Sequence, residues 1–164
     1  LYGVISFSFS YYGEMITYLG MTGPMAVAAL ISWLRNPYEG NRAQVRVGSL
    51  GRGEGAVLIV ATVIATVAFY YILAFFHTAN LTLSTVSVAT SFLAAYLTYK
   101  RSPYFALAYA ANDVVLIGLW ILAAASDAMY GAVAICFFMF LINDLYGFVC
   151  WSKMRKCQQC ETAG

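Results

Sequence analysis

The chain has 164 residues, of which 62% are hydrophobic and only 10% are charged. Soluble domains carry about 25% charged residues, so this composition excludes an ordinary soluble domain and indicates an integral membrane protein in a lipid bilayer. The net charge is only +2, and the sequence has no cluster of basic residues interleaved with aromatic ones, so we expect no nucleic-acid partner.

The beginning of the chain predicts an incomplete helix. Leu1 to Tyr12 is apolar and aromatic, but it is shorter than the roughly 20 residues that a membrane span needs. The run also lacks the charged start and the cleavage site of a signal peptide. We therefore expect part of a helix here, at least one further helix missing upstream, and a turn at Gly13 and Glu14.

Five complete transmembrane helices are predicted after that turn. Each is an apolar run long enough to cross the bilayer, and the runs cover residues 15–35, 55–77, 79–99, 104–124 and 128–151. Pro24 falls inside the first run and predicts a kink, because proline lacks an N–H and frees a backbone carbonyl. The predicted fold class is therefore an all-α helical bundle that spans the membrane.

The polar segments and the basic residues predict the topology. Residues 1–152 form a single transmembrane domain with one long loop at 36–54, whose glycines argue against a stable helix, and residues 153–164 form a polar, mobile tail. All nine basic side chains fall on one side of the membrane: Arg35, Arg42, Arg46, Arg52, Lys100, Arg101, Lys153, Arg155 and Lys156. By the positive-inside rule that side, with the C-terminus, is the cytoplasm.

Two apolar spans carry the same polar pattern. Asn112 and Asp113 precede Trp120 by the same spacing that separates Asn143 and Asp144 from Trp151. A charged side chain at the centre of a span costs about 2.5 to 3.5 kcal/mol on insertion scales, so it marks a functional site that has a partner or a wet cavity. The two pairs predict a polar cavity between packed helices, and we interpret this cavity as a solute site.

Aromatic residues share helical faces with these pairs. On the fourth span the shared face carries Phe105, Tyr109, Asn112, Leu116 and Trp120, and on the fifth it carries Phe140, Asn143 or Asp144, Gly147 and Trp151. Rings beside amides and carboxylates suit a flat heteroaromatic ligand with polar edges. The alternative is that the polar pairs only bond helix to helix. For Trp33 and Trp151 we favour anchoring at the membrane interface.

Catalytic and metal signatures are missing from the sequence. It has no Ser/His/Asp set in neighbouring segments, no glycine-rich phosphate loop and no HExxH motif, so we expect no enzyme and no cofactor. His77 is the single histidine, which argues against a metal site. Cys157 and Cys160 form a lone C-x-x-C pair that we interpret as inert and reduced in a cytoplasmic tail.

Several stretches together resemble the PnuC family of vitamin transporters. The segment from Asn143 to Phe148, followed by Trp151 and a basic tail, is similar to the last helix of that family. The segment from Ala111 to Trp120 is similar to its penultimate helix. Two further similar stretches are Ala94 to Leu97 before Lys100 and Arg101, and Gly23-Pro24-Met25 leading to Trp33 and Arg35.

The resemblance implies a seven-helix fold of two three-helix bundles joined by a linker helix, with the first helix and part of the second missing here. It also implies a homotrimer in the bacterial inner membrane that imports nicotinamide riboside by facilitated diffusion. The residues carried over to the binding site are Phe105, Asn112 and Asn143. With the face analysis, the expected substrate-binding set is Phe105, Tyr109, Asn112, Asp113, Trp120, Asn143, Asp144 and Tyr146.

Three alternatives remain open. The family often has tryptophans where this chain has Tyr104, Phe105 and Tyr109, and a glutamine at the position of Ala95, so the vitamin is thiamine or riboflavin in one alternative. In a second, uptake is coupled to protonation of Asp113 or Asp144. In a third, from another class, the chain is a non-transporting subunit of a membrane assembly, whose polar pairs hold helices together.

Overall fold

A computed structural model describes residues 15–39, 41–78 and 80–161. The partial helix expected at Leu1 to Tyr12, the turn at Glu14 and the expected first residue of the third span, Ala79, lie outside the described residues. Within them, five helices are long and apolar enough to cross a membrane. This confirms the number of complete spans expected from the sequence.

The first span consists of two kinds of helix. A π-helix, η1 (Thr17–Thr22), leads directly into α3 (Gly23–Leu34), and Pro24 stands in the first turn of α3. The Gly23 N–H bonds to the Tyr18 carbonyl, five residues back, as π-helical geometry requires. Proline is tolerated at the first turn of an α-helix, where its missing N–H has no partner in any case. The irregularity expected at Pro24 thus takes the form of π-helical turns before it.

The remaining spans are continuous helices. They are α4 (Arg52–Phe75), α5 (Leu81–Tyr99), α6 (Phe105–Ala124) and α7 (Gly131–Glu161), and a 3-10 turn, η2 (Ala128–Tyr130), precedes α7. The second span therefore begins earlier and ends earlier than the expected 55–77, and the last is much longer than the expected 128–151.

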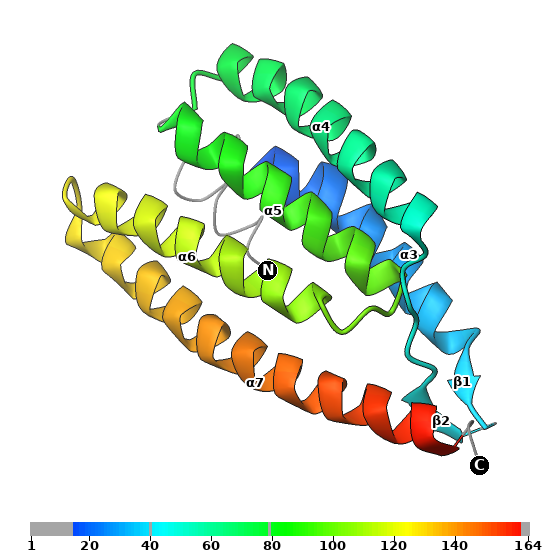
Figure 1. Cartoon of the computed structure of the whole chain (residues 1–164). Coiled ribbons are helices and arrows are strands. Elements are labelled where there is room, and N and C mark those ends of the chain that lie inside the picture. Colours follow the sequence, from blue (N-terminus) through cyan, green and yellow to red (C-terminus); the bar gives the residue numbers. More distant parts are fainter. Residues whose placement is uncertain (1–14, 40, 79, 162–164) are drawn as a thin grey trace.

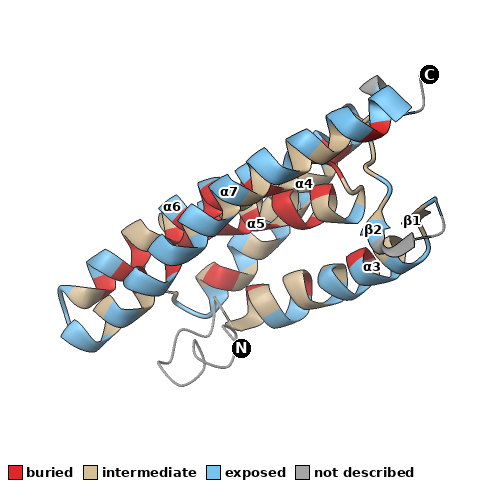
Figure 2. Ribbon diagram, turned by 90° about the horizontal axis from the view of Figure 1, so that it is seen from below, coloured by how far each residue is buried: buried red, intermediate tan, exposed pale blue. Residues whose placement is uncertain are grey.

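The helices lie side by side in chain order. α4 packs on α5, α5 on α6 and α6 on α7, while α3 packs against α5 from the other side (Figure 1). Buried residues gather along α5 and α6, whereas much of α4 and α7 is exposed (Figure 2). Exposed apolar faces are normal for a chain in lipid, because lipid tails are as apolar as the side chains that they contact.

The long loop contains a small hairpin. Strand β1 (Pro37–Tyr38) pairs antiparallel with β2 (Asn41–Val45), a detail that the sequence analysis did not predict. The chain then crosses close to the loop between α5 and α6, where the Gly48 N–H bonds to the Arg101 carbonyl at 3.0 Å. A Cβ on Gly48 would overlap with the backbone carbonyl of Lys100, so only glycine fits there.

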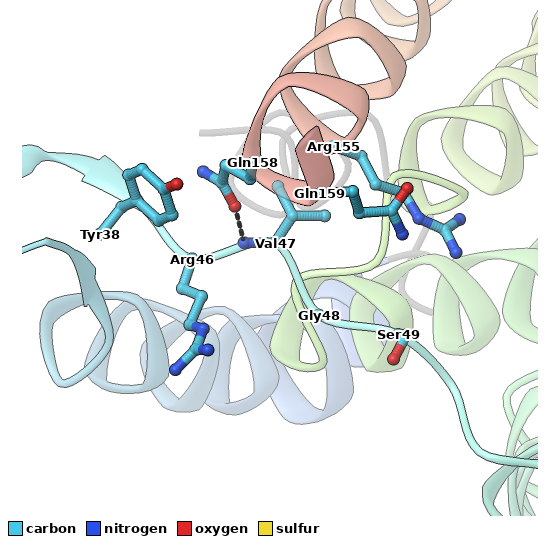
Figure 3. Close-up of a pocket in the computed structure, with 8 residues that line it drawn as sticks. All are labelled: Tyr38, Arg46, Val47, Gly48, Ser49, Arg155, Gln158 and Gln159. Atoms are coloured by element: carbon cyan, nitrogen blue, oxygen red, sulfur yellow. Dashed lines mark hydrogen bonds between the residues drawn. The ribbon is translucent and has the colours of Figure 1, made fainter. Parts of the chain in front are cut away.

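The polar tail is helical, which corrects the expectation of a mobile segment after Ser152. α7 continues to Glu161, and its last turns pack against the hairpin. The buried Gln158 accepts from the Val47 N–H at 2.9 Å and donates to the Val45 carbonyl at 3.1 Å (Figure 3). The tail residues Lys, Met, Arg and Gln are good helix formers, so the helix continues until its polar side chains find partners on the loop.

Candidate functional site

A cavity lies at mid-height between η1, α6 and α7. Its volume is about 310 Å³, near the lower end of the range of small-molecule sites. It lies where both polar pairs were expected to meet, and its lining residues are Tyr18, Tyr109, Asn112, Asp113, Phe137, Phe140 and Asp144. We call it the central cavity.

The amide of Asn112 bonds α6 to its neighbours. Its Oδ1 accepts hydrogen bonds from three hydroxyls of α5, those of Ser87 at 3.2 Å, Thr90 at 2.9 Å and Ser91 at 3.0 Å. Its Nδ2 donates to the hydroxyl of Tyr18 at 3.1 Å. Asn112 is 4% exposed. Most of its hydrogen-bonding capacity is used inside the protein, so it fixes α5 on α6 and orients Tyr18 at the edge of the cavity.

The two carboxylates of the repeated pattern face the same space. Asp113 on α6 and Asp144 on α7 both line the central cavity. Asp113 is 4% exposed, and its Oδ2 atom has no hydrogen-bond partner among the described residues. Asp144 is half-buried. This part of the prediction, two carboxylates at one polar cavity between packed helices, agrees with the geometry.

Aromatic rings form much of the rest of the wall. Tyr109 comes from α6, Tyr18 from η1, and Phe137 and Phe140 come from α7, with the last two ring centroids 5.8 Å apart. Phe140 was placed on the polar face of the fifth span by the sequence analysis but left out of the expected substrate-binding set. Phe137 was not predicted, although it precedes Asp144 by seven residues, a helical spacing that puts both on one face. Tyr18 carries no such signal in its own segment.

Three neighbouring cavities, which share lining residues, follow one another from the central cavity toward the basic side of the protein. A second cavity of about 220 Å³ lies between α3, α5 and α6, and Tyr109 lines both it and the central cavity. A third, of about 520 Å³, is lined by parts of α3, the hairpin and the end of α7, and shares Leu30 and Trp33 with the second. Polar and aromatic groups therefore border a path from mid-height to the basic loops.

Three aromatic side chains meet along this path. The ring centroids of Trp33 and Trp151 are 5.1 Å apart, and Phe105 lies 5.1 Å from Trp151 and 6.2 Å from Trp33. The Trp33 indole also donates to the Thr98 carbonyl at 2.8 Å. Trp33 and Trp151, for which anchoring at the membrane interface was expected, pack on each other and line the third cavity. Phe105 lies in this aromatic cluster, outside the residues that line the central cavity.

Besides Phe105, three further residues of the expected site lie outside the central cavity. Trp120 is fully buried in a core cluster with Leu116, Leu119 and Phe137, at the end of the bundle away from the basic loops. Asn143 and Tyr146 are exposed on α7, Tyr146 at 69%. Successive helical residues point about 100° apart, so Asp144 faces α6 and its neighbour Asn143 does not. None of the three lines the central cavity.

Two groups outside the spans have displaced pKa values. Lys100 donates to the Glu54 carboxylate at 2.6 Å, and this hydrogen bond raises the pKa of the Lys100 ammonium. The Tyr38 hydroxyl donates to Glu161 at 2.6 Å, and this bond raises the pKa of Tyr38 to about 12. Both contacts join segments at the basic end of the bundle. The first links the end of α5 to the start of α4, and the second links the hairpin to the end of α7.

No metal centre is formed by the described residues. They contain no group of three or more His, Cys, Asp or Glu side chains close enough to hold an ion. All four cysteines, Cys136, Cys150, Cys157 and Cys160, are free and exposed.

Comparison with known proteins gives three findings. The profile of a family described as nicotinamide mononucleotide transporter matches residues 1–153. A nicotinamide riboside transporter, PnuC, from Neisseria mucosa is 25% identical over 160 residues, which are 95% of this chain and 61% of that protein. A crystal structure of the vitamin B3 transporter PnuC superposes with a TM-score of 0.78 at 24% identity, over 96% of this chain and 68% of that one.

These findings bear first on the fold. The superposition confirms the predicted all-helical membrane architecture, in the five helices that the structure describes. The chain spans 61% of the length of the curated relative that it matches.

Proposed function

This chain belongs to the nicotinamide mononucleotide transporter family, and on that premise we propose that it carries nicotinamide riboside across the membrane by facilitated diffusion. The resemblance to PnuC transporters that the sequence suggested is confirmed by the family match. The protein is a multi-pass membrane protein. A relative of this chain has nicotinamide riboside transporter as its name.

The observation that carries the proposal is the composition of the central cavity. A riboside consists of a flat aromatic ring and a sugar rich in hydroxyl groups. Tyr109, Phe137 and Phe140 supply ring faces and edges for the flat part, while Asp113 and Asp144 accept hydrogen bonds from the hydroxyls. Enclosed aromatic surface with a few polar groups is the usual composition of a small-molecule site.

The same cavity favours the riboside over the mononucleotide of the family's description. The mononucleotide carries a phosphate group with about two negative charges near neutral pH. The described residues that line the cavity include two carboxylates and no lysine or arginine. Like charges in a poorly solvated space repel strongly, so a phosphate is excluded and an uncharged ribose hydroxyl is accepted.

The line of cavities supports a direction of release. From the central cavity the path passes Tyr109 and Trp33 to the basic loops. At the other end the Trp120 core cluster closes the space between α6 and α7. Alternating access requires a site that opens to one side at a time, and this arrangement corresponds to a state open toward the basic side.

We place the basic side in the cytoplasm of a bacterium, with the C-terminus there and the protein in the inner membrane, because basic loops are retained on the cytoplasmic side. We also propose that the protein is a homotrimer, as the resemblance implies. The exposed polar side chains of α7, Asn143 and Tyr146, support contact with a further chain segment or copy, since polar groups in lipid are costly. Native mass spectrometry in detergent tests the trimer.

Calorimetric titration of the purified protein tests the function. We expect saturable binding of nicotinamide riboside and none of thiamine or riboflavin. Tyr109→Ala is expected to weaken binding about tenfold, through loss of a stacking contact worth roughly 1 to 1.5 kcal/mol. Tyr71→Ala is the matched control, because Tyr71 is 69% exposed on α4 and touches none of the cavities.

Failure to bind nicotinamide riboside would overturn the proposal, and binding of thiamine or riboflavin in its place would reassign the solute. Uptake into proteoliposomes, with and without a pH gradient, tests the transport mode. Equal initial rates are expected for facilitated diffusion. Uptake that requires the gradient would replace this mode with proton coupling.

A further inference from the structure

One carboxyl group in the central cavity has no explanation in the packing of the described helices. The carboxyl group of Asp113 is 4% exposed, and its Oδ2 atom has no hydrogen-bond partner in the part of the chain that the structure describes. A buried charged group is normally paired with an opposite charge or fully hydrogen-bonded, because burial removes its hydration. Asn112, the preceding residue, has hydrogen bonds to three hydroxyls of α5 and to the Tyr18 hydroxyl. Two adjacent buried side chains therefore differ: the amide is satisfied by the protein and the carboxyl group is not.

Among the described residues, none that lines the cavity with Asp113 is a lysine, arginine or histidine. Asp144 lines the same cavity from α7, and the other lining residues are four aromatic residues and one amide: Tyr18, Tyr109, Phe137, Phe140 and Asn112. Two carboxylates that share a small space repel each other. An arrangement of two acceptors without a cation is completed by a ligand that brings positive charge.

The aromatic residues point to the same kind of ligand. Faces of aromatic rings carry partial negative charge and attract cations, and this attraction grows when water is excluded. Tyr109 lines the cavity from α6 and Phe137 and Phe140 line it from α7, on the two helices that carry Asp113 and Asp144. A flat, positively charged heteroaromatic ring satisfies both the rings and the carboxylates, whereas a neutral ring of the same size satisfies only the aromatic surface.

We propose that Asp113 and Asp144 recognise the positive charge of the solute's ring, so that the central cavity selects cationic nucleosides over neutral nucleosides of the same shape. This inference rests on the proposed function and identifies the positive charge of the ring as the property of the riboside that the site recognises. The pyridinium ring of nicotinamide riboside carries a permanent positive charge on the nitrogen that bears the sugar. Its reduced form, dihydronicotinamide riboside, has the same amide and ribose but no charge.

The two forms of the riboside provide a test that needs no mutation. Both are titrated calorimetrically into the wild-type protein in one buffer. We expect the oxidised, cationic form to bind at least about tenfold more tightly than the reduced form. A modest charge interaction is sufficient for a ratio of affinities of about tenfold. Equal affinities would overturn the inference and leave the proposed function intact. A protein that binds neither form would overturn the proposed function itself.

Charge-neutralising substitutions locate the effect. Asp113→Asn and Asp144→Asn keep the size of the side chain and remove its charge. Each is expected to weaken binding of the cationic riboside about tenfold and to change binding of the neutral form by less than about twofold. Asp127→Asn is the matched control, since Asp127 lies in the turn before η2 and asparagine caps a helix as well as aspartate does.

The pattern across ligands separates recognition from stability. If Asp113→Asn and Asp144→Asn weaken both forms of the riboside equally, the carboxylates act on the shape of the site and the inference is wrong. If Asp113→Asn does not fold, Asp144→Asn gives the same test, because Asp144 is only half-buried. A change of the same size in Asp127→Asn would also contradict the inference, because a general loss of negative charge would then explain the result.

Discussion

The two Asn-Asp patterns are alike in sequence and different in the folded chain. In α6, Asn112 is 4% exposed and bonded to α5, and Trp120 is fully buried in a core cluster. In α7, Asn143 is exposed, and Trp151 packs on Trp33 beside the path to the basic side. Of the three matching positions, only the aspartates, Asp113 and Asp144, lie together at one cavity.

Helix direction and position explain the difference. α6 and α7 run in opposite directions (Figure 1). The two aspartates therefore meet at mid-height, while the tryptophans seven residues further along each helix lie toward opposite ends. α6 also lies between α5 and α7, whereas α7 is at the edge of the described helices. A residue of α6 that faces away from α7 is therefore covered by α5, whereas a residue of α7 that faces away from α6 is exposed. Identical motifs thus acquire roles from their neighbours.

The largest expected effect separates the two tryptophans. Trp120→Ala is expected to lower the free energy of unfolding by about 3 to 5 kcal/mol, because it leaves a cavity in the closed core cluster. Trp151→Ala is expected to cost less than half of that amount, since Trp151 is only half-buried. Unfolding in mixed micelles, followed by circular dichroism, gives both values. Equal losses would contradict the different roles assigned to the two ends.

The second effect separates the two asparagines. Asn112→Leu leaves the hydroxyls of Ser87 and Ser91 without their acceptor, and we expect a loss of about 1 to 3 kcal/mol in the free energy of unfolding. Asn143→Leu removes an exposed amide and is expected to change stability by less than about 0.5 kcal/mol in the monomeric chain. The same unfolding assay measures both. A larger loss of stability for Asn143→Leu than for Asn112→Leu would contradict this assignment, because it would mean that Asn143 holds the helices together.

The smallest expected effect concerns the part of α7 beyond Trp151, because α6 has no corresponding extension beyond Trp120 and its last turn. α6 ends at Ala124, whereas α7 continues to Glu161 and holds the loop through Gln158. Gln158→Ala is expected to speed hydrogen exchange of the Val47 amide by about five- to tenfold, the value of one net hydrogen bond. Global unfolding is expected to change little.

Cys160→Ser is the control for that exchange measurement, because Cys160 is exposed on the same helix end. Unchanged exchange at Val47 in Gln158→Ala would show that the docked tail does not protect the loop.

The sequence was sufficient for the spans and for the acidic cavity. Apolar length identified all five helices, and the cost of charge in a span singled out Asp113 and Asp144 before any geometry was known. It was insufficient for side chains whose surroundings depend on distant segments. Tyr18 reaches Asn112 from another helix, and no local pattern indicates that contact.

Two other differences between the expected and the observed structure also arise from contacts with distant segments. The helical tail after Ser152 is stabilised by backbone groups more than a hundred residues earlier in the chain, as the bond from Gln158 to the Val45 carbonyl of the hairpin shows. Asn143 was expected at the site from its helical face and from the family resemblance, yet Asn143 and Asp144 are adjacent on the helix and point in different directions. Periodicity alone left the choice between the two open, and the packing of α6 on α7 selects Asp144.

The account depends most directly on the claim that solute occupies the central cavity. Phe140→Cys and Met139→Cys, each made in a chain whose four native cysteines are replaced by alanine, place a thiol inside the cavity and just outside it. Phe140 lines the cavity at 54% exposure, and Met139 is 60% exposed without lining it. The measurement is the rate of maleimide modification with and without nicotinamide riboside. We predict that the riboside slows modification at position 140 and leaves the rate at position 139 unchanged. Equal rates at position 140 with and without a saturating riboside concentration would contradict the assignment of the cavity as the solute site.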